Sequence, residues 1–225
     1  METLQMNRKA DYGNWVPAAM MKTFWAATAA IALVSVLMFV LIKSPVPGFI
    51  GIVVTLAALC MTIYMQRCRK LFDFRGGGVM GKIHQFLVDH FPRNEVVGKN
   101  ENGRIIDIGC GAGALTNRIA RMYPSAEITG VDFWGKEWSY AKEQCEKNAA
   151  LEGVAERVKF QKGDAANLDF ADAAFDGAVS NFVFHEVRSA KEKRDVVREA
   201  LRVVRKGGAF AFQDMFGQTA LYGEL

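Results

Sequence analysis

Two long apolar runs stand near the start of the chain. Residues 24–42 and residues 46–65 contain no charged side chain. A helix of roughly 20 apolar residues crosses the ~30 Å hydrocarbon core of a bilayer, and neither run shows the polar face of a helix that packs on a soluble core. Pro45 and Pro47 lie in a connection that is short enough only for an antiparallel turn. The pattern predicts a transmembrane helical hairpin over residues 24–66, against the alternatives of a cleaved signal peptide and of two buried core helices.

Basic residues flank the hairpin unevenly. They are Arg8, Lys9 and Lys22 before it, Lys43 in the connection, and Arg67, Arg69, Lys70 and Arg75 after it. Because basic residues favour the cytoplasmic side, we expect both termini to lie in the cytoplasm. Residues 1–23 are then a cytoplasmic segment, and residues 67–79 are a basic, glycine-rich linker.

Short apolar runs alternate with amphipathic stretches from residue 80 onward. The predicted strands cover residues 105–108, 126–132, 157–162, 175–182 and 209–215, and the predicted helices cover residues 80–91, 114–123, 136–151 and 190–204. Strands that alternate with helices indicate a parallel sheet covered on both faces. Residues 80–225 are therefore predicted to form a doubly wound α/β domain with a mostly parallel sheet, which binds ligands at the carboxyl ends of its strands.

Charge and cysteine content exclude some classes of partner. The formal net charge is +4, spread too thinly to indicate nucleic acid. Four cysteines and three histidines show no metal-ligand spacing, so we expect no metal site and reduced thiols in a protein that faces the cytosol. The sequence does not predict an oligomeric state.

A glycine-rich segment follows the first predicted strand. It reads Asp107-Ile108-Gly109-Cys110-Gly111-Ala112-Gly113. A strand that enters such a turn and then a helix brings a ligand close to bare backbone. The glycine spacing alone also fits a dinucleotide fingerprint, which leaves a nicotinamide-dependent oxidoreductase as an alternative. Asp107 argues against it, because a carboxylate there repels a pyrophosphate and attracts an ammonium group.

Five segments in order resemble the class I S-adenosylmethionine-dependent methyltransferases. They are IIDIGCGAG (105–113), ITGVDF (128–133), GDA (163–165), FDGAVSNFVFHEV (175–187) and LRVVRKGGAFAFQD (201–214). The resemblance covers residues 80–215 and implies a Rossmann-like fold with S-adenosylmethionine as cofactor. In that family the fold continues past the fifth strand, so a sequence ending at Leu225 is either a shortened variant or incomplete.

The resemblance also implies roles for individual residues. Asp107 would help to hold the methionine end of the cofactor, and the loop residues Gly109, Cys110, Gly111 and Gly113 would let it pack closely. Asp132 would accept both ribose hydroxyls, which makes a charge-assisted pair. The remaining implied contacts are Phe133, Asp164 and Ala165 to the adenine, and Asn181 and Phe182 beside the methyl donor.

His185 is the candidate catalytic residue, because it falls where the acceptor is expected. A structural or substrate-shaping histidine is the alternative. The resemblance predicts methyl transfer at the membrane surface to a small or lipid-like acceptor, but fold-level analogy does not choose that acceptor. A non-catalytic, membrane-bound cofactor-binding or interaction module remains a further alternative.

Overall fold

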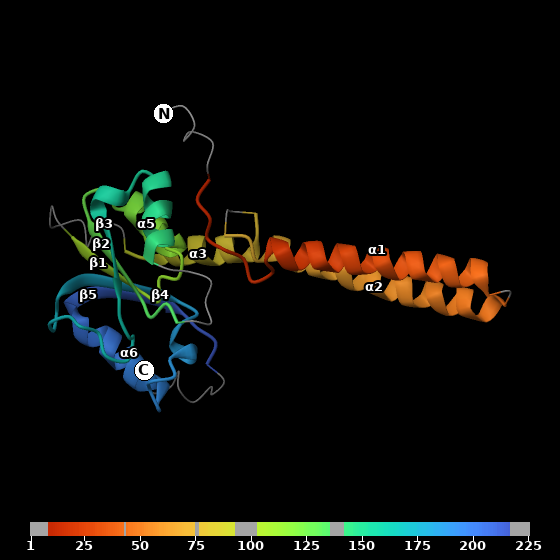
Figure 1. Ribbon diagram of the computed structural model, residues 1–225. Coiled ribbons are helices and arrows are strands. Elements are labelled where there is room, and N and C mark those ends of the chain that lie inside the picture. Colours follow the sequence, from red (N-terminus) through yellow and green to blue (C-terminus); the bar gives the residue numbers. More distant parts are fainter. Residues whose placement is uncertain (1–8, 43, 75–76, 93–102, 136–141, 217–225) are drawn as a thin grey trace. The chain divides into compact units, whose positions relative to one another are not determined.

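The computed structural model in Figure 1 describes residues 9–42, 44–74, 77–92, 103–135 and 142–216. The chain packs as two compact units. One unit is Asn14–Lys82, and the other joins Met1–Gly13 to Ile83–Leu225. Lys43, Arg75 and part of the predicted linker lie outside the described residues.

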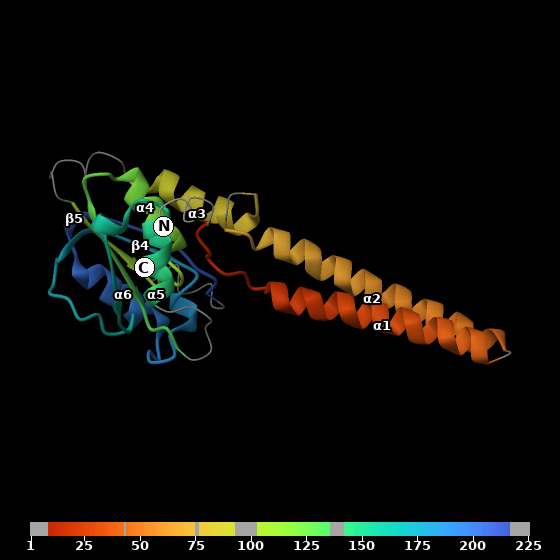
Figure 2. The ribbon, with the colours of Figure 1, turned by 45° about the horizontal axis from the view of Figure 1, so that its top comes forward.

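The first unit is built on two long apolar helices that lie side by side (Figures 1 and 2). They are α1 (Ala18–Leu41) and α2 (Pro45–Leu71). Helix α1 begins directly after Pro17, a residue that readily precedes or opens a helix. Helix α1 starts before the first uncharged run, and α2 ends after the second one. The flanking Ala, Met, Arg and Lys residues are good helix formers.

Small and hydroxyl-bearing residues line the contact between α1 and α2. The hydroxyls of Thr28 and Thr62 hydrogen-bond at 2.8 Å, and both residues are buried. Ser35 Oγ donates to the carbonyl oxygen of Gly51 at 3.2 Å. A Cβ atom at Gly51 would lie 2.6 Å from Ser35 Cβ, so glycine is needed for this close approach. Small residues and buried hydroxyl pairs are typical of helix contacts inside membranes.

The second unit contains a parallel sheet. Its strands are β1 (Arg104–Ile108), β2 (Glu127–Asp132), β3 (Val158–Lys162), β4 (Phe175–Asn181) and β5 (Val204–Gln213). Among the described residues they form one five-stranded sheet in the order β3-β2-β1-β4-β5, with every pairing parallel. The order reverses at β1, so the carboxyl ends of β1 and β4 flank the crevice in which such sheets bind ligands.

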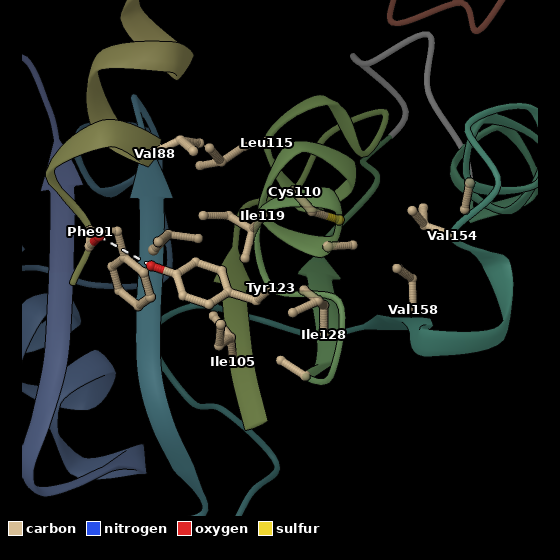
Figure 3. Packing of buried hydrophobic residues seen from close by; sticks show 14 of the residues in the cluster. Val88, Phe91, Ile105, Cys110, Leu115, Ile119, Tyr123, Ile128, Val154 and Val158 are labelled. Carbon is tan, nitrogen blue, oxygen red and sulfur yellow. Dashed lines mark hydrogen bonds between the residues drawn. The ribbon is translucent and has the colours of Figure 1, made fainter. Parts of the chain in front are cut away.

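Helices cover both faces of the sheet (Figures 1 and 2). Helices α3 (Val79–His90), α4 (Ala114–Met122) and α5 (Lys142–Leu151) contribute to one buried cluster, and α6 (Lys193–Val203) contributes to the other. Figure 3 shows the first cluster, in which the Tyr123 hydroxyl donates to the carbonyl oxygen of Phe91 at 3.1 Å. The predicted Rossmann-like architecture is therefore confirmed.

The spacing of apolar residues predicts that Phe86 of α3 and Leu201 of α6 face the core, and both predictions are wrong. Phe86 is 55% exposed and stacks on His90, while His84, Leu87 and Val88 turn inward. On α6, Leu201 is exposed and Val203 is fully buried. On α3 the buried stripe is rotated by one position from the predicted one, because neighbouring residues differ by 100° around a helix. On α6 the error is confined to one margin of the stripe. Residues 136–141 of the predicted fourth helix lie outside the described residues.

Candidate functional site

The turn after β1 is bent so that its backbone faces β2. Gly109 and Cys110 both donate their amides to the carbonyl oxygen of Val131, at 2.7 and 3.0 Å. Gly109, Gly111 and Gly113 all have positive φ, which side-chain-bearing residues rarely adopt. A Cβ at Gly109 would collide with Val183, whereas one at Gly111 would meet nothing within 4 Å. Gly111 therefore opens the loop toward a ligand, and Gly109 packs against the protein.

Asp132 ends β2 and holds two backbone amides. Its Oδ2 accepts from Gly111 N at 2.8 Å, and its Oδ1 accepts from Trp134 N at 2.8 Å. A carboxylate has about four acceptor positions, so two hydroxyl donors can still bind. The resemblance implies that the glycine-rich loop and the end of β2 bind the same cofactor. A direct hydrogen bond between Gly111 N and Asp132 already joins them.

Asp107 lies inside the sheet, on β1. It is 1% exposed, and its Oδ2 accepts from the Thr116 hydroxyl at 2.5 Å. Burial raises the pKa of Asp107 to about 7, with a smaller contribution from Asp132, while the Thr116 hydrogen bonds act in the opposite direction. A buried carboxyl group of this kind favours a cationic ligand, because a nearby positive charge restores its ionised form.

The segment after β4 carries strain and an unpaired polar atom. Phe182 has a φ of 57°, which costs on the order of 1–3 kcal/mol for a residue with a side chain. The side-chain oxygen of Asn181 is buried and has no hydrogen-bond partner. Such features concentrate at ligand sites. Both residues were predicted to face the methyl donor; they lie at the carboxyl end of β4, and that role stays a prediction.

His185 is joined to the end of β5. Its Nδ1 lies 2.5 Å from Asp214 Oδ1. The other oxygen of Asp214 accepts the amides of Val183 and Phe184, at 3.2 and 2.7 Å. The Asp214 side chain is fully buried, and the His185 side chain is 24% exposed. The carboxylate thus fixes the orientation of an imidazole whose Nε2 lies 3.6 Å from Glu186 Oε1.

The three predicted adenine contacts have different surroundings. Phe133 is 61% exposed, with Lys162 Nζ 5.3 Å from its ring centroid, so a ring face is accessible for stacking. Asp164 instead closes its own turn, because its Oδ1 accepts from Ala166 N and from the Ser189 hydroxyl. Ala165 packs at the edge of the second cluster.

Three supporting residues around the loop were not predicted from the sequence. Trp134 Nε1 donates to Gly111 O at 2.9 Å, and Cys145 Sγ lies 3.0 Å from the same oxygen. Asn148 Nδ2 donates to Ala112 O at 2.9 Å. Trp134 stands two residues after Asp132 and has a φ of 43°, yet no feature of the sequence marked it. Cys145 and Asn148 look like ordinary helix residues until the chain is folded.

Comparisons with known proteins identify the family of this domain. Residues 106–212 match the family model of a methyltransferase domain. An arsenite methyltransferase from Aquipseudomonas alcaligenes is 32% identical over 126 residues, which cover 54% of this chain and 35% of the relative. A ubiquinone/menaquinone biosynthesis C-methyltransferase from Desulfotalea psychrophila is 31% identical over 144 residues, which cover 62% of this chain and 54% of the relative.

A solved structure shows the same fold. A Galdieria sulphuraria protein assigned as a sarcosine dimethylglycine methyltransferase has a TM-score of 0.50 at 18% identity, over 63% of this chain and 48% of that chain. The fold and site define a Rossmann-like methyltransferase domain. The domain formed by residues 106–212 belongs to the class I S-adenosylmethionine-dependent methyltransferases, which confirms the predicted family and cofactor and decides against a nicotinamide-dependent oxidoreductase. The chain spans about half the length, or less, of the curated relatives described above.

The residues present fit that cofactor. The open side of Gly111 leaves room over the loop, Asp107 offers a buried carboxyl group for an ammonium, and Asn181 holds an unused acceptor. Asp132 retains acceptor positions for two hydroxyls.

Replacement of Asp132 by alanine tests the ribose assignment. The variant loses the acceptor for two hydroxyls and also releases Gly111 N and Trp134 N, so we expect affinity for S-adenosylmethionine to fall by more than about tenfold. Calorimetric titration of the full chain in detergent measures this. Asp172→Ala, which removes an exposed carboxylate paired with Arg202 outside the predicted site, is the matched control. Unchanged affinity in Asp132→Ala would remove the assignment.

The titration of Asp107 predicts a pH dependence of cofactor binding. Below its pKa of about 7 the carboxyl group is protonated and loses its attraction for the cofactor's ammonium. Affinity should therefore rise roughly five- to tenfold from about pH 6 to about pH 7.5, before the α-amino group itself deprotonates near pH 8. Titrations at several pH values measure the rise, and Asp107→Asn should flatten it. A flat profile in the wild-type chain would contradict the role of Asp107.

Proposed function

We propose that this protein transfers a methyl group from S-adenosylmethionine to a small or hydrophobic acceptor at the cytoplasmic surface of a membrane. The single observation that carries the proposal is the shared edge of the sheet, where Asp107, Asp132 and Asn181 lie at or next to the carboxyl ends of β1, β2 and β4. His185 follows β4. When bound, the cofactor supplies an activated methyl group on a sulfonium. The chain then has to bind and orient the two reactants and exclude water.

The first unit supports the membrane location. Helices α1 and α2 have mean hydropathy values of 2.4 and 2.3 over their most apolar windows, and only 6% and 11% of those windows are buried. Core helices of soluble proteins are mostly buried, so this exposure favours a lipid environment. The basic flanks favour a cytoplasmic position for both termini and for the methyltransferase domain.

Labelling from outside the cell tests that topology. In a chain whose cysteines are replaced, we expect Lys43→Cys to react with a membrane-impermeant maleimide on intact cells. Lys142→Cys, in the methyltransferase domain, should react only after lysis. Labelling of Lys142→Cys on intact cells, or protection of Lys43→Cys, would contradict the proposed topology.

The membrane location favours an acceptor that partitions into lipid. The relatives include a C-methyltransferase of ubiquinone/menaquinone biosynthesis and a sterol 24-C-methyltransferase from Gibberella zeae. These relatives support a lipid-like acceptor. We infer a hydrophobic acceptor that is delivered from the bilayer.

We propose His185 as the catalytic base, with Asp214 as its positioning residue. The short contact between His185 Nδ1 and Asp214 Oδ1 fixes the ring and leaves Nε2 to accept a proton. An acceptor hydroxyl or carbon acid must lose a proton during methylation, whereas a thiolate needs no base. The dyad therefore favours an acceptor with a weakly acidic O–H or C–H group.

Radiolabelled methyl transfer tests the function and the dyad together. We expect the full chain in nanodiscs to label a component of a membrane lipid extract, and Asp132→Ala to abolish the labelling. His185→Ala should reduce turnover about 10²- to 10⁴-fold while cofactor affinity stays unchanged. Asp214→Asn should lower turnover less and shift the pH profile. Cofactor binding without transfer to any extract would instead favour a non-catalytic module.

A further inference from the structure

The segment that precedes α1 in the chain packs on the methyltransferase domain. Residues 9–13, called the N-terminal clamp below, belong to the same compact unit as that domain. The side chains of Ala10 and Tyr12 are 7% and 8% exposed. A short segment without helix or strand structure is thus buried against a domain that begins about 70 residues later.

Asn148 of α5 binds the clamp through both of its polar atoms. Its Oδ1 accepts from Asp11 N at 2.8 Å, and its Nδ2 donates to Asp11 O at 2.7 Å. The same Nδ2 donates to Ala112 O of the cofactor loop at 2.9 Å. Asn148 is fully buried. One side-chain amide therefore joins the clamp directly to the loop, and Gln144 Nε2 supports it by donating to Asn148 Oδ1 at 3.2 Å.

Tyr12 makes a second attachment. Its hydroxyl accepts from Asn117 Nδ2 at 3.2 Å and donates to Glu152 Oε1 at 3.0 Å. Asn117 is buried on α4. Its backbone N–H donates to the carbonyl oxygen of Gly113, the last glycine of the loop. The clamp thus touches both helices that support the cofactor loop.

We propose that the N-terminal clamp holds the cofactor loop in its binding conformation, with Asn148 as the positioning residue. The loop has three glycines with positive φ and therefore many other conformations to visit. Hydrogen bonds to its carbonyl oxygens restrict that freedom before the cofactor arrives, which reduces the entropy lost on binding. The segment leading into the membrane hairpin is then part of the cofactor site. This inference rests on the proposed function for the identity of the ligand.

Two pairs of variants of the full chain in nanodiscs test the clamp. Asp11→Pro removes the backbone N–H that donates to Asn148 Oδ1. Asp11→Ala keeps the backbone N–H and carbonyl groups and loses only the side chain, which Asp11→Pro loses as well, so it is the matched control. Asn148→Ala removes the bridge, and Lys147→Ala, at an exposed neighbouring position on α5, is its control. Calorimetry with S-adenosylmethionine measures affinity well below the melting temperature, and hydrogen exchange reports on residues 109–113.

We expect Asp11→Pro and Asn148→Ala to weaken cofactor binding at least about fivefold, which corresponds to about 1 kcal/mol, and to speed exchange in the loop. Both controls should match the wild type. A merely structural clamp would lower the melting temperature without changing affinity, and that outcome would overturn the proposal. Unchanged exchange in the loop would overturn it as well. If the wild type binds no S-adenosylmethionine, the proposed function fails, while the exchange data still decide whether the clamp orders the loop.

Discussion

The hydrogen bond between the Asp132 carboxylate and the amide of Gly111 joins the two halves of the site. It connects the carboxyl end of β2 to the glycine-rich turn after β1 at 2.8 Å. The bond is charge-assisted, and such bonds are roughly twice as strong as neutral ones. Because Gly111 has positive φ and no neighbour on its open side, its path depends on hydrogen bonds to its own amide and carbonyl groups. The parallel pairing of β1 with β2 brings these two groups into range.

The other supports of the loop come from the segment after β2 and from α5. Trp134 and Cys145 contact Gly111 O, and Asn148 contacts Ala112 O. These side chains therefore fix the backbone of the loop by hydrogen bonds, while the groups expected to meet the ligand keep unused hydrogen-bond acceptor positions. Such preorganisation is what binding and catalytic sites require. The Asp214 carboxylate acts in the same way, because it orients the His185 ring and accepts the backbone amides of Val183 and Phe184.

Much of this could be predicted from the sequence, because the relevant signals are local. Charge-free runs of sufficient length indicated α1 and α2, and alternating periodicity indicated the parallel sheet. The glycine spacing and the acids at the ends of two strands indicated the ligand loop. The errors at Phe86 and Leu201 have a local origin too, since a residue at the margin of an apolar stripe can face the core or the solvent without changing the period of the pattern.

The sequence by itself determined the two apolar helices, the α/β class and the edge of the sheet that carries Asp107 and Asp132. Only the tertiary structure decided that Asn148 binds Asp11 and that Asp214 orients His185. These pairs lie 137 and 29 residues apart in the chain. No local periodicity or motif specifies which polar groups meet over such distances, because their partners are set by how the helices and strands pack and by the need to pair every buried polar group.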